Sequence, residues 1–283
     1  QVLENGRIVM NNFWALIGNP YLWLQFPHTM FSGFTTAAFF VLGISAYHLV
    51  RKKEISLFTK SFKLAAIVGL ISIIAVILLG HRQGQMIASF QPMKTASEEA
   101  LWHTEDPASF AFISIVNQEE QEELLALRVP YFLSILMYNR PTGAVQGITE
   151  LQEEYVAKYG SGNYIPNVML NFWSFRIMVG IGFFLLLSAF IAVLWQRQKK
   201  PLYSRKLLVV FPYILFLPYI SNTAGWLLAE VGRQPWVVFG LLKTQDAVSP
   251  NITTGMVLTS LIGFGLLYAI LIAADVHLLA KYA

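Results

Sequence analysis

Long apolar stretches separated by polar links dominate the pattern of this 283-residue chain. A window of about 20 apolar residues is long enough to cross a bilayer as a helix. Such windows predict five spanning helices: Leu22–Val50, Phe62–Leu79, Phe172–Trp195, Leu207–Ala229 and Thr254–Ala280. The expected fold is therefore an all-α polytopic membrane protein, a bundle of about five transmembrane helices.

One polar segment interrupts this pattern, the long loop from Gly80 to Asn171. Loops of this length are uncommon in compact proteins unless they are functional or disordered. The segment is not of low complexity, so we expect a functional loop. Thr95–Trp102 and Ile148–Tyr159 have the composition of helices, and Gly160 is a good terminator of the second. The expected organisation has three parts: residues 1–80 with two membrane helices, 81–171 as the loop, and 172–283 with three membrane helices.

Composition and charge place these parts relative to a membrane. The chain is 55% hydrophobic and only 13% charged, against about 25% charged in soluble domains. The two short links, residues 51–63 and 197–206, hold 10 of the 20 Lys and Arg, and short basic links lie on the cytoplasmic side. The long loop carries eleven acidic and five basic residues. We expect a multi-pass protein of the plasma membrane, with this loop extracytoplasmic and the C-terminus cytoplasmic. The lipid bilayer is then an expected partner of the chain, and no nucleic acid is expected as one.

The chain has no cysteine, which excludes disulfides, iron–sulfur clusters and zinc–thiolate sites. Any metal must use His, Met or carboxylate ligands. His28, Met178 and Glu230 come from three predicted helices, each near the outer end, so we expect them at one depth in the membrane. Polar residues within spans are candidate sites. A His/Met pair suits the axial ligation of a low-spin haem, and Arg176 could support it. Taken singly, a membrane His is more often a helix–helix contact and a Met is core filler.

The loop offers a second candidate pair, Lys94 and Glu99. Five residues apart, they would lie about 140° apart around a helix and could not form a simple pair. Lys94 with Glu98, four residues apart, is the ordinary ion-pair alternative. A quinol site needs an acceptor for the hydroxyl proton, which Glu99 can be, and a cation such as Lys94 for the other oxygen.

Four segments, in order, resemble signature segments of subunit I of cytochrome bd quinol oxidase: Phe26–Thr29, Gly80–Trp102, Phe175–Met178 and Gly225–Trp236. The resemblance implies that His28 and Met178 ligate a low-spin haem b, with Arg176 beside it. It further implies that Glu230 ligates a high-spin haem b or haem d, supported by Arg233 and Trp236. Lys94 and Glu99 would belong to the site of quinol oxidation at the outer face.

The activity implied is that of a quinol oxidase, using ubiquinol or menaquinol. Electrons would pass through the low-spin haem to a high-spin haem pair that reduces dioxygen to water, contributing to the proton-motive force. A second membrane subunit is implied as partner. The family has about four helices before that of His28, so we expect an N-terminal part to be missing and the Glu230 haem site to be completed by it. The number of residues between Lys94 and Arg176 is similar to that in the short quinol-loop branch of the family.

Two alternatives remain open. One is a membrane b-type cytochrome that oxidises quinol and passes the electrons to a partner without oxygen chemistry. The other is a transporter or receptor-like bundle without cofactors. Transporters often show repeated halves and helices broken at the midplane, whereas this sequence has no internal repeat and its polar residues gather at one surface.

Overall fold

A computed structural model describes residues 2–4, 7–9, 12–198, 200–249 and 251–282. By internal contacts the chain forms two units, Gln1–Lys243 and Thr244–Ala283. The second unit consists of a short 3-10 turn, Thr244–Asp246, and the helix α10, Thr254–Tyr282. The first unit contains all the candidate site residues.

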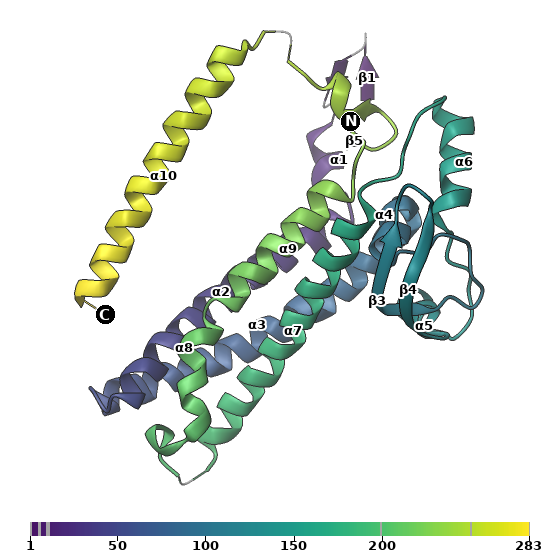
Figure 1. The fold of residues 1–283 in the computed structure, drawn as a ribbon. Helices are drawn as coiled ribbons and strands as arrows, with labels where there is room; N and C mark the ends of the chain where they lie inside the picture. The colour runs from purple at the N-terminus through teal and green to yellow at the C-terminus, as the bar shows by residue number, and fades with distance from the viewer. Residues whose placement is uncertain (1, 5–6, 10–11, 199, 250, 283) are drawn as a thin grey trace. The chain divides into compact units, whose positions relative to one another are not determined.

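The membrane part of the first unit consists of α2 (Leu22–Val50), α3 (Ile55–Phe90), α7 (Val168–Gln196) and α9 (Leu217–Val231), preceded by the short α1 (Phe13–Ile17). These long helices run side by side (Figure 1). With α10, the described residues contain five helical segments long and apolar enough to cross a membrane. The expected all-α bundle of five spans is confirmed.

The fourth span is not the continuous helix that was expected. It is divided into a 3-10 turn (Lys206–Val210), α8 (Phe211–Ile214) and α9. Pro218 explains the interruption, because proline lacks the N–H that would bond to the carbonyl of Ile214 and its ring clashes with that carbonyl. Another 3-10 turn, Leu202–Ser204, lies in the link before it.

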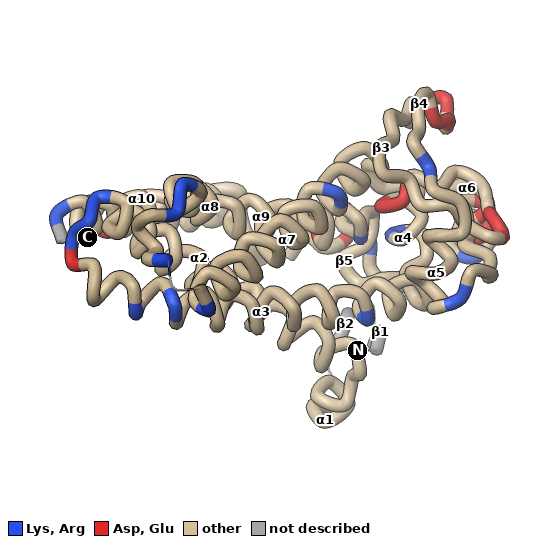
Figure 2. The backbone as a smooth tube through the Cα atoms, turned by 90° about the horizontal axis from the view of Figure 1, so that it is seen from below, with Lys and Arg blue, Asp and Glu red and all other residues tan. Residues whose placement is uncertain are grey.

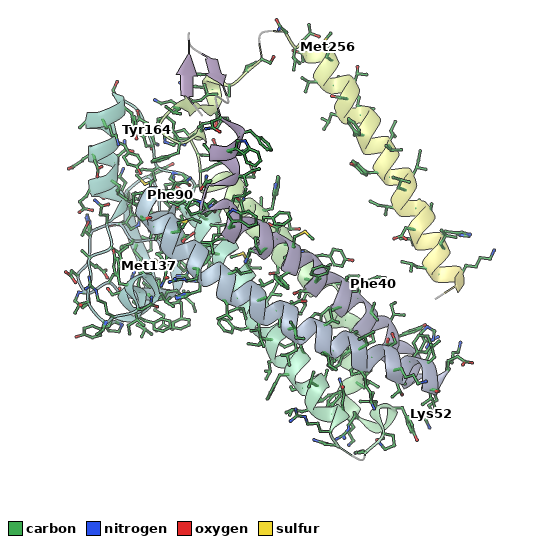
Figure 3. All side chains as sticks on the ribbon, turned by 180° about the vertical axis from the view of Figure 1, so that it is seen from behind. Phe40, Lys52, Phe90, Met137, Tyr164 and Met256 are labelled. Carbon is green, nitrogen blue, oxygen red and sulfur yellow. The ribbon has the colours of Figure 1, made fainter. Side chains whose placement is uncertain are left out.

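The core of the bundle lies where α2, α3, α7 and α8 meet. Its buried side chains alternate between large rings and small residues, so that the helices approach closely. They include Phe39, Leu42, Ala46, Phe62, Ala66, Leu185, Ala189 and Phe211. Lys and Arg gather at the end of the bundle where α2 turns into α3 and α7 into α8 (Figure 2). Lys52 lies at that end and Phe90 at the opposite end of the α2–α3 pair (Figure 3).

The segment between α3 and α7 is a folded layer rather than an irregular loop. Its elements are α4 (Pro92–Glu98), β3 (Phe110–Asn117), β4 (Glu122–Val129), α5 (Phe132–Tyr138) and α6 (Ile148–Tyr159). The antiparallel hairpin β3–β4 was not expected. Two short hairpins, β1 (Val2–Glu4) with β2 (Arg7–Val9) and β5 (Trp236–Val238) with β6 (Leu242–Lys243), complete the strands of the described residues.

The boundaries of this layer differ from the expected ones on the N-terminal side. α3 continues through Phe90, ten residues beyond Gly80, so His81 lies within a helix. α4 begins at Pro92, which is favourable in the first turn of a helix. α6 has the expected bounds and ends at Gly160, whose φ of +92° favours glycine.

Candidate functional site

The imidazole of His28 is oriented by a main-chain carbonyl of the neighbouring helix. Nδ1 lies 3.1 Å from the carbonyl oxygen of Val76 in α3. A carbonyl can only accept, so Nδ1 carries the proton and Nε2 presents its lone pair. This is the usual arrangement of a metal-ligating histidine, whose other ring N–H donates to a carbonyl or carboxylate. Gly80 allows the ring to lie here, because a Cβ at Gly80 would be 3.1 Å from Cε1 of His28.

Met178 lies in α7 with its sulfur directed at α9. A Cβ added at Gly225 would lie 2.9 Å from Sδ of Met178, so the thioether rests on a glycine surface. Ser221, one turn earlier in α9, donates to the main-chain carbonyl of Met178 at 3.2 Å. Met178 is therefore level with Gly225. Glu230 lies five residues further along, about 7.5 Å at 1.5 Å per residue, so Met178 and Glu230 lie at different levels.

The helices of His28 and Met178 occupy opposite positions in the bundle. α2 packs against α3 and α9, and α7 packs against the same two helices, so α2 and α7 are diagonal. Hydrogen bonds join α2 to α9: Ser32 donates to Asn222 at 2.6 Å, and Asn222 donates to Thr36 at 3.0 Å. Ligands from diagonal helices approach the centre of a bundle from opposite sides, which is the geometry that bis-axial ligation requires.

Arg176 anchors the long loop to α7. Its Nη2 lies 2.7 Å from Oε2 of Glu99, and the pair is buried, with the side chains 9% and 0% exposed. The guanidinium also donates to the carbonyls of Ala111 and Glu98. Its Cζ lies 4.3 Å from the ring centres of both Phe110 and Phe172. Arg176 thus holds α4 and β3 against α7, two residues before Met178.

The carboxylate of Glu99 keeps one oxygen unused. Oε1 is buried and has no hydrogen-bond partner among the described residues. Burial raises the pKa of Glu99, and the charge and hydrogen bond of Arg176 oppose this rise. A buried acceptor without a partner is costly, which makes Oε1 a position where a substrate hydroxyl would be stabilised.

Lys94 lies on the other side of α4 and faces the end of α9. Its side chain lies directly on Gly232, where a Cβ would be 3.1 Å from Cγ and Cε of the lysine. Burial lowers the pKa of Lys94, and the charge of Glu98 opposes this change. The charge of Arg233 lowers the pKa further, and that of Glu230 raises it. The expectation that Lys94 and Glu99 form no simple pair agrees with this arrangement.

Glu230, Arg233 and Trp236 surround this position. Arg233 forms an ion pair with Glu230 one turn before it. Trp236 is buried and stacks on Tyr164, with ring centres 5.7 Å apart and planes at 18°. Lys243 of β6 closes the cluster, donating to the Tyr164 hydroxyl at 3.1 Å.

A small cavity of about 10 Å³, roughly the room for one water molecule, opens between α4 and these residues. Its wall includes Met93, Lys94, Tyr155, Tyr164, Arg233 and Trp236. Aromatic faces with two cations suit a flat, oxygen-bearing ring. A larger hollow of about 200 Å³, lined in part by Trp102, Glu123 and Arg128, contains none of the expected site residues.

The structure therefore divides the expected residues into separate groups. Arg176 joins Glu99, whereas Lys94 joins Arg233 and Trp236 at one cavity. His28 and Met178 lie deeper, on α2 and α7. Within the described residues there is no cluster of three or more His, Cys, Asp and Glu, and a His/Met pair needs none.

Sequence reasoning missed three features of the site. Gly80 and Gly225 were noted only as parts of motifs, and their contacts with His28 and Met178 depend on helix packing that no local pattern reports. Glu98 was read as an ordinary ion-pair partner, yet it is buried. The available signal was the spacing of Lys94 and Glu98 on a helix with several small neighbours.

Comparisons with known proteins show which family the chain is similar to. Residues 1–283 match the family described as cytochrome bd terminal oxidase subunit I. The chain is 44% identical over 280 residues to the cytochrome bd ubiquinol oxidase subunit 1 of Bacillus subtilis, covering 99% of this chain and 60% of that protein. It is 33% identical over 284 residues to the putative cytochrome bd menaquinol oxidase subunit I of the same organism, covering 98% of this chain and 61% of that protein.

A solved structure is similar as well. The bd oxidase from Geobacillus thermodenitrificans aligns with a TM-score of 0.80 and 29% identity, over 99% of this chain and 62% of that chain. The chain thus spans about 60% of the length of these relatives.

Proposed function

The chain belongs to the cytochrome bd terminal oxidase subunit I family, and from this premise we propose that it oxidises quinol as part of a membrane quinol:oxygen oxidoreductase. Electrons would leave quinol at the outer face, pass through a low-spin haem b to a high-spin haem pair, and reduce dioxygen to water. The observation that carries the proposal is the orientation of His28, whose Nε2 is left as a free ligand atom by the contact of Nδ1 with Val76.

His28 and Met178 would hold the low-spin haem b. The fit rests on three observations: the protonated Nδ1 of His28, the diagonal positions of α2 and α7, and the glycines that lie against both side chains. When bound, a haem with His/Met ligands supplies a reversible one-electron couple. Arg176 is committed to Glu99 and to main-chain carbonyls. It therefore supports the site by fixing α7 beside Met178.

Glu230 would ligate a high-spin haem b or haem d, with Arg233 and Trp236 as supports. The ion pair with Arg233 would orient the carboxylate of Glu230. The chain spans about 60% of its relatives' length, so the remainder of this haem site would come from other parts of the protein. Reduction of dioxygen is proposed for that complete assembly.

The quinol site would lie on the loop layer, residues 81–171 in the proposed division, between the two-helix and three-helix parts. Lys94 lines the cavity and would donate to a quinol oxygen, while Glu99 would accept a hydroxyl proton at its free Oε1. The names of the relatives include both ubiquinol and menaquinol oxidases, and both quinols would fit this chemistry.

The protein is an integral membrane protein, and we place its acidic loop outside the cell. The basic links 51–63 and 197–206 then lie in the cytoplasm. Protons from quinol would be released outside, so turnover would contribute to the proton-motive force. A second membrane subunit would complete the oxidase in the plasma membrane.

The test is a reduced-minus-oxidised visible spectrum of the membrane complex, with wild type compared to Met178→Leu. Loss of a low-spin b band in the variant is expected, because leucine offers no ligand atom. An unchanged spectrum would overturn the His28/Met178 assignment. The alternative, a b-type cytochrome without oxygen chemistry, predicts the same loss but no high-spin, ligand-binding haem. A high-spin band that Glu230→Gln removes would therefore favour the oxidase.

A further inference from the structure

Glu98 is a buried carboxylate to which the proposed function gives no role. Lys94 and Glu98 are four residues apart on α4 and share one face of the helix. Glu99 is about 100° further round and turns to Arg176 on α7. Lys94 lines the cavity, and Glu98 is therefore the carboxylate that follows it on the same face of α4.

The two glutamates differ in how they are held. Glu99 is fully buried and fixed in an ion pair, whereas none of the ion pairs among the described residues involves the carboxylate of Glu98. Arg176 meets Glu98 only through its main-chain carbonyl, at 3.2 Å. The side chain of Glu98 is 4% exposed and that of Glu99 is 0% exposed. Glu98 is thus the less constrained of two adjacent carboxylates.

The charges that face Glu98 come from three elements. Lys94 and Glu99 lie on α4 itself, and Arg176 approaches from α7. Burial raises the pKa of the phenol of Tyr21, just before α2. The charge of Glu98 is near enough to raise it as well. Burial raises the pKa of Glu98 to about 8, Lys94 opposes this rise and Glu99 adds to it. The Tyr21 hydroxyl accepts a hydrogen bond from Gln83 at 2.8 Å, which extends the polar surroundings towards the start of α2.

We propose that Glu98 is a second proton-accepting carboxylate of the quinol site, serving the hydroxyl on the Lys94 side. This inference rests on the proposed function. Oxidation of one quinol releases two protons, and the site has two carboxylates on different sides of α4. In the step, the quinol O–H bond breaks and an O–H bond forms on Glu98. The electrons leave separately to the ferric haem as oxidant. Glu98 then returns its proton to water at the outer face.

The test is the pH profile of kcat/KM for quinol oxidation by the intact membrane complex. Glu98 accepts a proton only when ionised, so the wild-type rate should rise as pH increases through about 8. Glu98→Gln should lose this rise, with activity at high pH lowered tenfold or more and little change at low pH, in line with general-base contributions of about 10²- to 10⁴-fold. Glu98→Asp should restore the rise. Glu153→Gln, at an exposed position of α6, is the matched control and should follow wild type.

Infrared spectroscopy supplies a readout that is independent of turnover. A buried carboxyl C=O band should be present in wild type at neutral pH, disappear as pH rises through about 8, and be lost in Glu98→Gln or shifted in Glu98→Asp. A wild-type pH profile in Glu98→Gln, or the absence of such a band, overturns the inference. Failure of the wild-type complex to oxidise quinol would instead overturn the proposed function, and the infrared titration would still report on Glu98.

Discussion

Arg176→Gln tests the buried ion pair that joins the loop layer to α7. Removing one partner of a buried pair costs about 3–5 kcal/mol, because the other charge is left without compensation. The side chains of Arg176 and Glu99 are 9% and 0% exposed, so this estimate for a buried pair applies to them. The carbonyls of Ala111 and Glu98 also lose a donor. We expect the free energy of opening α4 away from α7 to fall by about 3–5 kcal/mol.

Amide hydrogen exchange of α4 in the intact complex measures this opening directly. Since 1.4 kcal/mol is a factor of ten, the buried amides of Thr95, Ala96 and Ser97 should exchange roughly 10²- to 10⁴-fold faster. Arg82→Gln is the control, because Arg82 is exposed and bonds only to Gln85 among the described residues, one turn away. Its effect should stay within about 0.5 kcal/mol.

The pH dependence and a double variant make the reasoning refutable. Burial already raises the pKa of Glu99, and loss of Arg176 raises it further. A carboxyl group whose pKa is raised by folding stabilises the folded state at pH values below its pKa in the unfolded chain. This stabilisation is lost as pH rises through the pKa of the folded state. The excess exchange of Arg176→Gln should therefore be small near pH 5 and grow towards pH 9. Adding Glu99→Gln should remove most of it. Exchange within threefold of wild type, or strictly additive effects, would refute the ion-pair argument.

Two further predictions concern the bundle. Gly80→Ala should displace the ring of His28 and shift the low-spin haem spectrum, because the new Cβ would lie 3.1 Å from Cε1, whereas Gly84→Ala, with nothing within 4 Å, should leave the spectrum unchanged; equal spectra for both variants would contradict the contact. Asn222→Ala should lower the thermal stability of the solubilised complex by about 1–2 kcal/mol, since Asn222 bonds to both Ser32 and Thr36, and Thr223→Ala, whose hydroxyl bonds within its own helix, is the comparison.

The membrane part of the fold was predictable because hydrophobic length alone determines it. All five spans were found in this way, the first with the bounds of α2, whereas the ends of the second, third and fourth spans were not. Apolar windows end where polar residues begin, so the second span was expected to stop at Leu79. α3 continues to Phe90, since a polar sequence such as His81–Gln85 remains compatible with a helix. α6 was found with its bounds because Gly160 ends it in a conformation that favours glycine.

The loop layer shows where local reasoning is insufficient. The run from Phe110 to Asn117 is rich in aromatic and β-branched residues, a signal for β3, yet no strand was predicted there. The position of the hairpin depends on contacts such as that of the Ser114 hydroxyl in β3 with the carboxylate of Glu123 in β4, and that of Arg128 with the carbonyl of Ala100, at 2.9 Å. The second of these joins residues 28 positions apart.

α4 explains why the candidate residues separate as they do. α4 presents Lys94 to α9, and its C-cap residue Glu99 turns to α7, because five positions turn a helix through about 500°, or 140° beyond a full turn. Lys94 lies on Gly232, two residues after Glu230, and Glu99 binds Arg176, two residues before Met178. The short helix α4 and the residue after it are thus tied to the helices of two of the proposed haem ligands, Glu230 and Met178. A quinol that binds at α4 would perturb both attachments at once, and Glu98, between them and tied to neither by an ion pair, is the carboxylate best able to change its charge there.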